Sequence, residues 1–364
     1  RPRCRRQTPS SPSDCSRPAA LAPSLLPGAG AVRFREMVAL FGSPSQAWDA
    51  TPASLERDAA SDVAARALER AERAGAQVVV SGDAEYPEAL LELRYPPPVL
   101  FAIGALEQLR APCVAIVGTR RATSYGERVT AELAGALARA GATVVSGMAR
   151  GVDGVAHQAA LRAGGRTVAV LGTGVDVAYP AAHRALHAEI GARGLLLSEE
   201  LPGDRATGGS FPKRNRIIAG LATATIVVEA PHRSGALITA DCASELTRGV
   251  GAVPGPIDVP QSAGTNLLLR DGAIVIAEVA DALALVGVSP PRAASRAPSD
   301  ATQLAIWLAL DAPAPDLDTL AMRASLPARR CLAAVTALEL DGAIECALTG
   351  EIRRRGVSSR LREE

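Results

Sequence analysis

Three cations lie close together in the stretch GGSFPKRNRIIAGL, which spans residues 208–221. Its polar centre is formed by Lys213, Arg214, Asn215 and Arg216, and Lys213 is the only lysine in the 364 residues. The whole chain has 39 basic and 38 acidic residues, a net charge of only +1, so this concentration of charge is local. Ammonium and guanidinium groups bind phosphate oxygens through charge-assisted hydrogen bonds. We therefore expect a phosphate-binding loop here, leading into a helix over 215–222.

Glycine-rich segments that also contain Ser, Thr or Arg follow other predicted strands, for example GTRRATSYG, SGMARGVDGVAH and EAPHRSGALITA. Glycine allows close backbone approach to a ligand, and helix N-termini present free N–H groups to an anion. One such loop would signify little, because strand-to-helix turns often need glycine. Several at one sheet edge predict an extended phosphate-binding surface. Its candidate residues are Gly118, Thr119, Arg120, Ser146, Gly147, Arg150, Gly174, Phe211, Lys213, Arg214, Asn215, Arg216, Ser234 and Gly235.

Aromatic residues are rare in this chain, which has four Phe, four Tyr and two Trp. Three of these ten fall in the same segments, namely Tyr125, Tyr179 and Phe211. Aromatic faces between cations suit unpaired bases, which stack on them while the nucleic-acid backbone follows the charge. The alternative is that Tyr179 and Phe211, each followed by proline, only wedge their loops in place. The sequence leaves both interpretations open.

The elements that must position these segments follow a regular rhythm. Apolar runs predict strands at 76–80, 99–103, 114–117, 143–145, 167–171, 194–197, 225–228, 250–253 and 273–276. Helices are predicted at 126–140, 154–163, 183–191, 215–222 and 235–247. Strands that are apolar throughout and alternate with helices are typical of a parallel sheet covered on both faces. We predict an α/β fold with a Rossmann-like doubly wound parallel sheet, whose ligands bind beyond the carboxyl ends of the strands.

Further domains are expected on either side of this sheet. The N-terminal one is a small helical domain, similar to a SAM or helix-hairpin-helix domain, and the C-terminal one is a winged helix with a hairpin turn at Thr349-Gly350 and with Leu338, Leu340 and Ile344 in its core. The predicted divisions are a disordered tail at 1–24, the helical domain at 25–75, the Rossmann-like core at 76–286 (clearest from 105), a Pro/Ser/Ala-rich linker at 287–301, the winged helix at 302–355 and a tail at 356–364.

Common catalytic and metal-binding patterns are missing from the sequence. There is no P-loop GK[ST], no nicotinamide-type GxGxxG after the first strand, no HExxH around His183 and His187, and no CxxC among the six cysteines. Acidic residues near the strand ends are expected to cap helices or orient arginines, although they could supply an acid/base pair: Asp153, Asp176, Glu199, Glu229 and Asp241. No apolar run is long enough for a membrane span. We expect a cytoplasmic protein without catalytic residues, metal or cofactor.

The motifs together resemble the DNA-processing protein A (DprA/Smf) family. They include VAIVGTRRATSYG, SGMARGVDGVAHQAAL, VLGTGVDVAYP, SEELPG, FPKRNRIIAGL, VVEAPHRSGALITA and GTNLLLRDGA, in the family's order. The resemblance is strongest over 105–286, extends to 25–104, and reaches the winged helix through LAAVTALELDGAIE. His183 stands where the family usually has Asn, and Asp241 where a basic residue is frequent.

The resemblance implies a protein that binds single-stranded DNA, protects incoming DNA during natural transformation, loads the RecA recombinase and forms a homodimer through the Rossmann-like domain. It places the DNA pocket on Arg120 and on Phe211, Lys213, Asn215 and Arg216, with Ser146, Gly147 and the Gly174 loop nearby. Two alternatives stay open. One is a LOG-like nucleotide phosphoribohydrolase, for which Glu229 is present but the PGG loop is missing. The other is an adaptor that binds duplex DNA through the winged helix.

Overall fold

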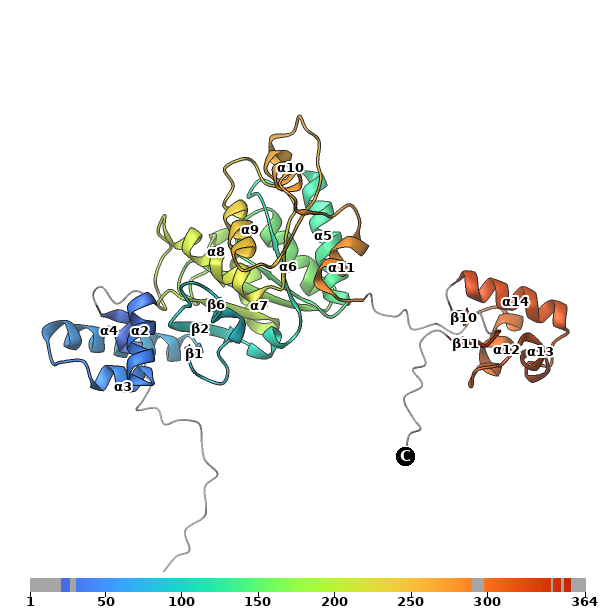
Figure 1. Cartoon of the computed structure of the whole chain (residues 1–364), viewed down its shortest axis with the longest axis horizontal. Coiled ribbons are helices and arrows are strands. Elements are labelled where there is room, and N and C mark those ends of the chain that lie inside the picture. Colours follow the sequence, from blue (N-terminus) through green and yellow to red (C-terminus); the bar gives the residue numbers. More distant parts are fainter. Residues whose placement is uncertain (1–20, 27–30, 290–297, 342, 348–349, 355–364) are drawn as a thin grey trace, which may run out of the picture. The chain divides into compact units, whose positions relative to one another are not determined.

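The structure is a computed structural model that describes residues 21–26, 31–289, 298–341, 343–347 and 350–354. The chain forms two compact units, residues 1–290 and 291–364 (Figure 1). Residues 1–20, residues 27–30, the middle of the predicted linker, Thr349 and the tail at 356–364 lie outside the described residues.

Nine strands of the first unit form one sheet in the order β1-β2-β6-β5-β4-β3-β7-β8-β9. The strands are β1 (Gln77–Val80), β2 (Val99–Gly104), β3 (Cys113–Val117), β4 (Thr143–Ser146), β5 (Arg166–Leu171), β6 (Leu195–Ser198), β7 (Ala224–Val227), β8 (Gly249–Ala252) and β9 (Ile274–Val275). Strands β3 to β9 are parallel, whereas β2 pairs antiparallel with β1 and β6. The predicted Rossmann-like fold is confirmed, with the antiparallel β2 as an addition.

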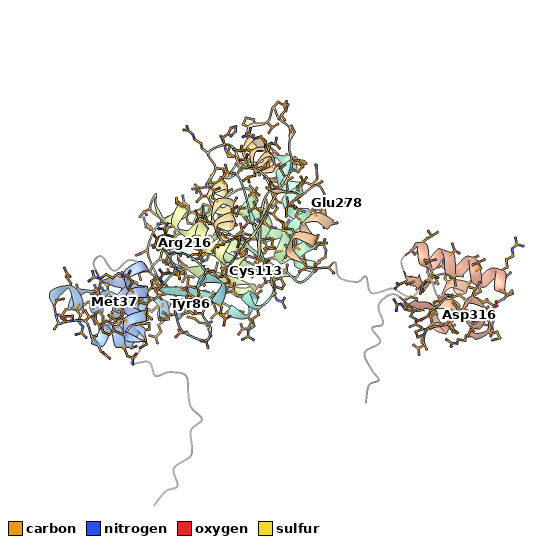
Figure 2. The ribbon with its side chains drawn as sticks, in the orientation of Figure 1. Met37, Tyr86, Cys113, Arg216, Glu278 and Asp316 are labelled. Carbon is orange, nitrogen blue, oxygen red and sulfur yellow. The ribbon has the colours of Figure 1, made fainter. Side chains whose placement is uncertain are left out.

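Helices cover both faces of this sheet because its strands are apolar on both sides. Val114 and Ile116 of β3 pack toward α5 and α6, while Cys113 and Ala115 belong to the core under α8 and α9. Cys113 is labelled in Figure 2. Burial raises the pKa of the Cys113 thiol to about 12. The helices are α5 (Ser124–Arg139), α6 (Val152–Arg162), α7 (Arg184–Arg193), α8 (Ser210–Leu221), α9 (Gly235–Glu245), α10 (Ala263–Arg270) and α11 (Val279–Val286).

The order of the parallel strands reverses beside β3. The chain runs outward from β3 through β4 and β5 to β6, and then returns to place β7 on the other side of β3. The loops after β3 and β7 therefore leave the sheet in opposite directions and open a crevice at its carboxyl edge. Helix α8, which connects β6 to β7, lies beside this crevice.

The N-terminal helices share a core with the sheet. They are η1 (Ala22–Leu25), α2 (Ala31–Phe41), α3 (Pro44–Asp49) and α4 (Leu55–Arg73). Leu21 and Trp48 are buried in one cluster with Val78 and Phe101 of β1 and β2. Residues 21–24, predicted as the end of a disordered tail, instead form a buried turn, because two of them, Leu21 and Ala22, contribute to this core.

The second unit has the predicted winged-helix fold. It comprises α12 (Ala301–Ala309), α13 (Leu317–Arg323), α14 (Ala328–Leu340) and the hairpin of β10 (Ile344–Cys346) with β11 (Ile352–Arg354). Leu338 and Ile344 are buried as expected, but Leu340 is 83% exposed. It ends α14 two positions after Leu338 and therefore points away from the core. Among the described residues, no helix combines the length and apolar character needed to cross a membrane.

Candidate nucleic-acid interface

A cavity of about 520 Å³ occupies the crevice where the strand order reverses. Its walls come from the loop after β3, the loop after β7 and the first two turns of α8. Eight of the predicted site residues line it: Gly118, Thr119, Arg120, Phe211, Arg214, Asn215, Ser234 and Gly235. Segments far apart in the sequence thus meet at one edge of the sheet, as the strand pattern predicts.

The segment FPKRNR is helical, so the prediction of a loop before residue 215 is wrong. Helix α8 begins at Ser210, whose hydroxyl accepts a hydrogen bond from the N–H of Thr207 at 3.1 Å. Pro212 lies in the first turn, where a helix needs no backbone N–H donor. Helical spacing then separates neighbouring side chains onto different faces. Arg214 faces the cavity, whereas Lys213 and Arg216 line a second hollow.

Arg214 is a buried cation rather than an exposed one, with 6% of its surface accessible. Its guanidinium Nη1 donates to the carbonyl of Gly147 at 2.6 Å and to that of Val170, and so joins the ends of β4 and β5. A side chain at Gly147 would overlap this guanidinium, which explains the glycine. Burial lowers the pKa of Arg214 to about 10, so the group stays charged at neutral pH. Its Nε has no partner among the described residues, a costly state for a buried donor.

Asp153, in the first turn of α6, is a buried carboxylate whose charge interacts with that of Arg214. Its Oδ2 accepts hydrogen bonds from the N–H groups of Gly147 and Ala149 at 3.2 and 3.3 Å. Burial raises the pKa of Asp153, and the charge of Arg214 acts in the opposite direction. Asp153 therefore positions the Gly147 turn and balances the arginine, as expected for an orienting acid.

An aromatic stack forms the rim of the cavity. The Arg120 guanidinium lies 5.1 Å from the Phe211 ring centroid, and the Tyr179 ring lies 5.4 Å from that of Phe211. Tyr179 is 47% exposed, so part of this stack faces solvent. Tyr125, the third predicted aromatic, lies elsewhere, and its hydroxyl donates to the carbonyl of Pro254.

The start of α9 forms the opposite wall. Ser234 caps this helix by accepting a hydrogen bond from the N–H of Ala236 at 3.3 Å. Asn215 donates from Nδ2 to the carbonyl of Gly235 at 3.0 Å and so ties α8 to α9. The positive end of the α9 dipole and the exposed Arg233 thereby face the same space as Arg120.

Six predicted residues do not line this cavity. Ser146 is buried and donates to the carbonyl of Ile116, so its role is structural. Gly147 lies under Arg214, Gly174 packs against the 201–203 turn, and Arg150 is exposed outside the cavity. Lys213 and Arg216 line the second hollow, of about 490 Å³, together with Glu199 and Glu200.

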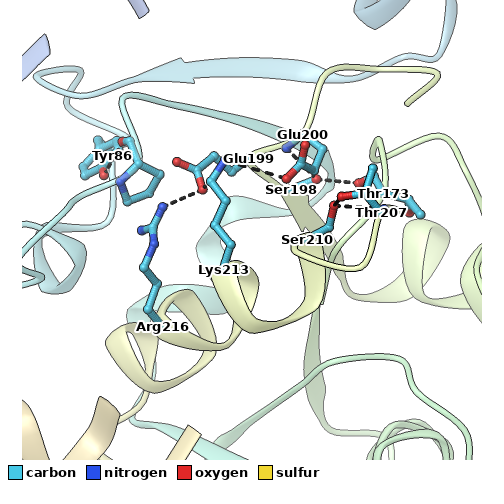
Figure 3. Close-up of polar contacts among 10 residues, drawn as sticks. Tyr86, Thr173, Ser198, Glu199, Glu200, Thr207, Ser210, Lys213 and Arg216 are labelled. Atoms are coloured by element: carbon cyan, nitrogen blue, oxygen red, sulfur yellow. Dashed lines mark hydrogen bonds and ion pairs between the residues drawn. The ribbon is translucent and has the colours of Figure 1, made fainter. Parts of the chain in front are cut away.

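Glu200 is a site residue that the sequence interpretation missed. Figure 3 shows Lys213 and Arg216 rising from α8 toward Glu199 and Glu200, which follow β6 directly. Lys213 Nζ lies 3.5 Å from Glu199 and 3.7 Å from Glu200, and Arg216 Nη2 lies 2.5 Å from Glu199. The sequence could have indicated this contact, because the two glutamates of SEELPG follow a predicted strand at the same sheet edge as the lysine.

Glu229 is fully engaged in capping α5. Its carboxylate accepts hydrogen bonds from the backbone N–H and the hydroxyl of Thr123, at 2.9 and 2.5 Å. A side chain at Gly126 would overlap this carboxylate. Glu229 is 2% exposed and does not line the cavity beside Arg120.

Replacing Phe211 with alanine tests the stack as a base-binding surface. We expect the affinity for an oligothymidylate to fall by about 1–3 kcal/mol, roughly five- to a hundredfold, because stacking on an aromatic ring is lost. Fluorescence anisotropy of a labelled oligonucleotide measures this change. Tyr125→Ala is the matched control, since Tyr125 lies outside the cavity. Equal affinities of Phe211→Ala and the parent would show that the ring only wedges its loop.

Comparison with known sequences identifies two regions. The pattern of a family described as DNA recombination-mediator protein A matches residues 77–287, and that of the DprA winged helix domain matches residues 290–347. Protein Smf of Synechocystis is 45% identical over 227 residues, which cover 61% of this chain and 57% of that protein. A putative DNA processing protein DprA of Mycobacterium tuberculosis is 37% identical over 330 residues, 82% of this chain and 85% of the relative.

Two solved structures share the fold. DNA processing protein A of Streptococcus pneumoniae has a TM-score of 0.63 and 35% identity, covering 73% of this chain and 95% of that one. The protein from Helicobacter pylori, described for its single-stranded DNA binding mode, has a TM-score of 0.53 and 33% identity, covering 58% of this chain and 96% of its own.

Proposed function

This chain belongs to the DNA recombination-mediator protein A family, and from that membership we propose that it binds single-stranded DNA in the cavity at the strand-order reversal. The observation that carries the proposal is the meeting of Arg120, Arg214 and Arg233 with the α9 N-terminus around one cavity. These groups are suited to one phosphate of a strand. Among the described residues that line the cavity, Asp153 is the only one with a carboxylate, and it faces three arginines, so the net charge of this lining is positive.

The mode of binding follows from the stack at the rim. A phosphate held by Arg120 and the exposed Arg233 would place the adjoining base near Phe211 and Tyr179. Every base has a π-face, so stacking tolerates any sequence. A duplex keeps its bases stacked on one another and gains nothing from these rings. The site is therefore expected to prefer single strands.

The wider role follows from family membership and not from the cavity. We propose that the chain protects single-stranded DNA in the cytoplasm, transfers it to the RecA recombinase and acts as a homodimer formed through the Rossmann-like domain. Lys213 is proposed as a further contact to the DNA backbone, because it is half exposed one turn from the cavity. The exposed Arg150, outside the cavity, is a proposed peripheral contact.

We propose a binding protein rather than a nucleotide hydrolase. A phosphoribohydrolase of the LOG type would need its glutamate free to act on the ribose. Here both carboxylate oxygens of Glu229 accept hydrogen bonds from Thr123. The winged helix offers little positive charge on α14, where only Arg329 and Arg330 are basic, so we do not assign it duplex DNA.

Replacing Arg120 with glutamate tests the proposed site. The affinity for a labelled oligothymidylate is expected to fall more than about tenfold, because a phosphate contact becomes a repulsion. Arg139→Glu makes the same change of charge at the far end of α5, in an exposed position outside the cavity, and should bind nearly as the parent does. Binding of the parent should also weaken with salt. If Arg120→Glu and Arg139→Glu have equal affinities, the cavity is not the DNA site.

A further inference from the structure

Helix α8 divides its three cations between two environments. Arg214 is buried beneath the cavity, whereas Lys213 and Arg216 lie against the acidic pair that follows β6 (Figure 3). We refer to Glu199 and Glu200 as the acidic pair. The two cations that the family resemblance places on DNA therefore already have anionic partners within the chain.

The acidic pair holds the two cations with different strength. Arg216 Nη2 lies 2.5 Å from Glu199 Oε2, and these side chains are only 16% and 11% exposed. Lys213 Nζ lies 3.5 Å from Glu199 and 3.7 Å from Glu200, and 52% of its side chain is exposed. Glu200 is 25% exposed, so this pair is partly open to solvent, and a solvent-accessible ion pair at such distances contributes little. Arg216 is thus fixed, while Lys213 can exchange its partner at small cost.

The hollow behind these residues is itself unsuited to phosphate. Three carboxylates line it, those of Glu199, Glu200 and Asp204, against the two cations of Lys213 and Arg216. Its lining therefore carries a net charge of about −1 at neutral pH. A DNA strand would be repelled from the hollow, so its phosphate could reach Lys213 only where this side chain faces solvent.

We propose that the acidic pair competes with the DNA backbone for Lys213 and thereby sets the affinity of the site. This inference rests on the proposed function, since it requires single-stranded DNA to pass the first turns of α8. The Phe211 ring packs on Gly172, which follows β5, and Lys213 lies against the acidic pair, which follows the neighbouring β6. The stack and the lysine therefore lie at one edge of the sheet, along which a bound strand can pass both. Glu200 acts on Lys213 alone, whereas Glu199 also anchors Arg216. Binding then exchanges one anionic partner of Lys213 for another, which weakens the complex and speeds release.

A double-mutant cycle with Glu200→Gln and Lys213→Met tests the competition. Affinities for a labelled oligothymidylate are measured for the parent, each single variant and the double variant at one salt concentration. Glu200→Gln alone is expected to tighten binding about two- to fivefold, because Lys213 is released from a competitor. In the Lys213→Met background the same substitution should change affinity by less than about 1.5-fold.

Glu132→Gln is the matched control, because Glu132 is exposed on α5 and forms no ion pair among the described residues. It removes one negative charge without freeing a cation. The proposal is overturned if Glu200→Gln tightens binding equally in both backgrounds, or no more than Glu132→Gln does. Failure of the parent itself to bind the oligonucleotide would overturn the proposed function and this inference together. Thermal unfolding of the parent and of the four variants establishes that all five proteins are folded.

Discussion

Replacing Arg214 with methionine is expected to lower the free energy of unfolding by about 3–5 kcal/mol, the usual cost of leaving a buried charge without its counter-charge. The substitution deletes the hydrogen bonds to the carbonyls of Gly147 and Val170 and leaves the buried Asp153 without its nearby cation. Urea denaturation followed by circular dichroism measures the change. DNA binding should be lost as well, because the cavity loses its buried cation.

Two further variants separate the causes of this loss. Lys at position 214 restores a charge but cannot donate in the fork geometry of a guanidinium, so Arg214→Lys should recover only part of the stability. Adding Asp153→Asn to Arg214→Met should also recover part of it, because the unpaired buried carboxylate is then removed. A urea midpoint of Arg214→Met equal to that of the parent would show that Arg214 and Asp153 do not form a stabilising network.

Acidification is expected to destabilise the first unit through His157. This residue of α6 is fully buried, and its pKa falls from 6.5 to about 3, first because of burial and then because of the nearby charges of His183 and Arg214. The Thr167 hydroxyl donates to the carbonyl of Val144, so the His157 Nδ1 must donate to Thr167 at 2.7 Å. Its Nε2 is then unprotonated and, within the described part of the chain, unpaired.

The sign of the effect follows from the lowered pKa. Above pH 6.5 His157 is neutral in both the folded and the unfolded chain and contributes nothing to the pH dependence. As the pH falls below 6.5, only the unfolded chain takes up the proton. The free energy of unfolding then drops by about 1.4 kcal/mol per pH unit until pH approaches 3.

Urea midpoints between pH 7 and pH 4 measure this dependence. Glutamine at position 157 cannot titrate. The free energy of unfolding of His157→Gln should therefore fall less steeply with acid than that of the parent, and the difference in slope should correspond to the uptake of about one proton. His187→Gln is the control, because that imidazole is only partly buried, whereas His157 is fully buried. Equal slopes for the parent and His157→Gln would exclude His157 as the source.

The strands could be predicted from the sequence because burial on both faces makes each of them an apolar run. The direction of β2 could not, since an apolar run such as VLFAIG has the same appearance in parallel and antiparallel pairing. The crevice was predictable once the strands were known, because the carboxyl ends of parallel strands share one edge. The position of β3 between β4 and β7 could not be predicted from the sequence and is known only from the strand order in the structure.

The start of α8 could not be predicted from the local sequence. Glycines and a proline around FPKRNR indicated a loop, yet Pro212 is compatible with the first helical turn, so the helix begins earlier. This five-residue difference changes the direction of every side chain in the segment. In the structure Arg214 is a buried cation and Lys213 lies against an acidic pair, whereas the sequence analysis placed all three cations in one phosphate-binding loop.

The shared core of the N-terminal helices and the sheet bears on how the protein can be divided. The family pattern begins at residue 77, at the start of β1. A fragment cut at that point would lose Leu21, Trp48 and the buried alanines of α4, and would leave Val78 and Phe101 facing water. Such a fragment is expected to aggregate when expressed alone, because the sheet would expose an apolar face next to an edge strand. The boundary of the family pattern is thus not a boundary of folding, and a shortened protein for crystallisation should keep the chain from residue 21 onward.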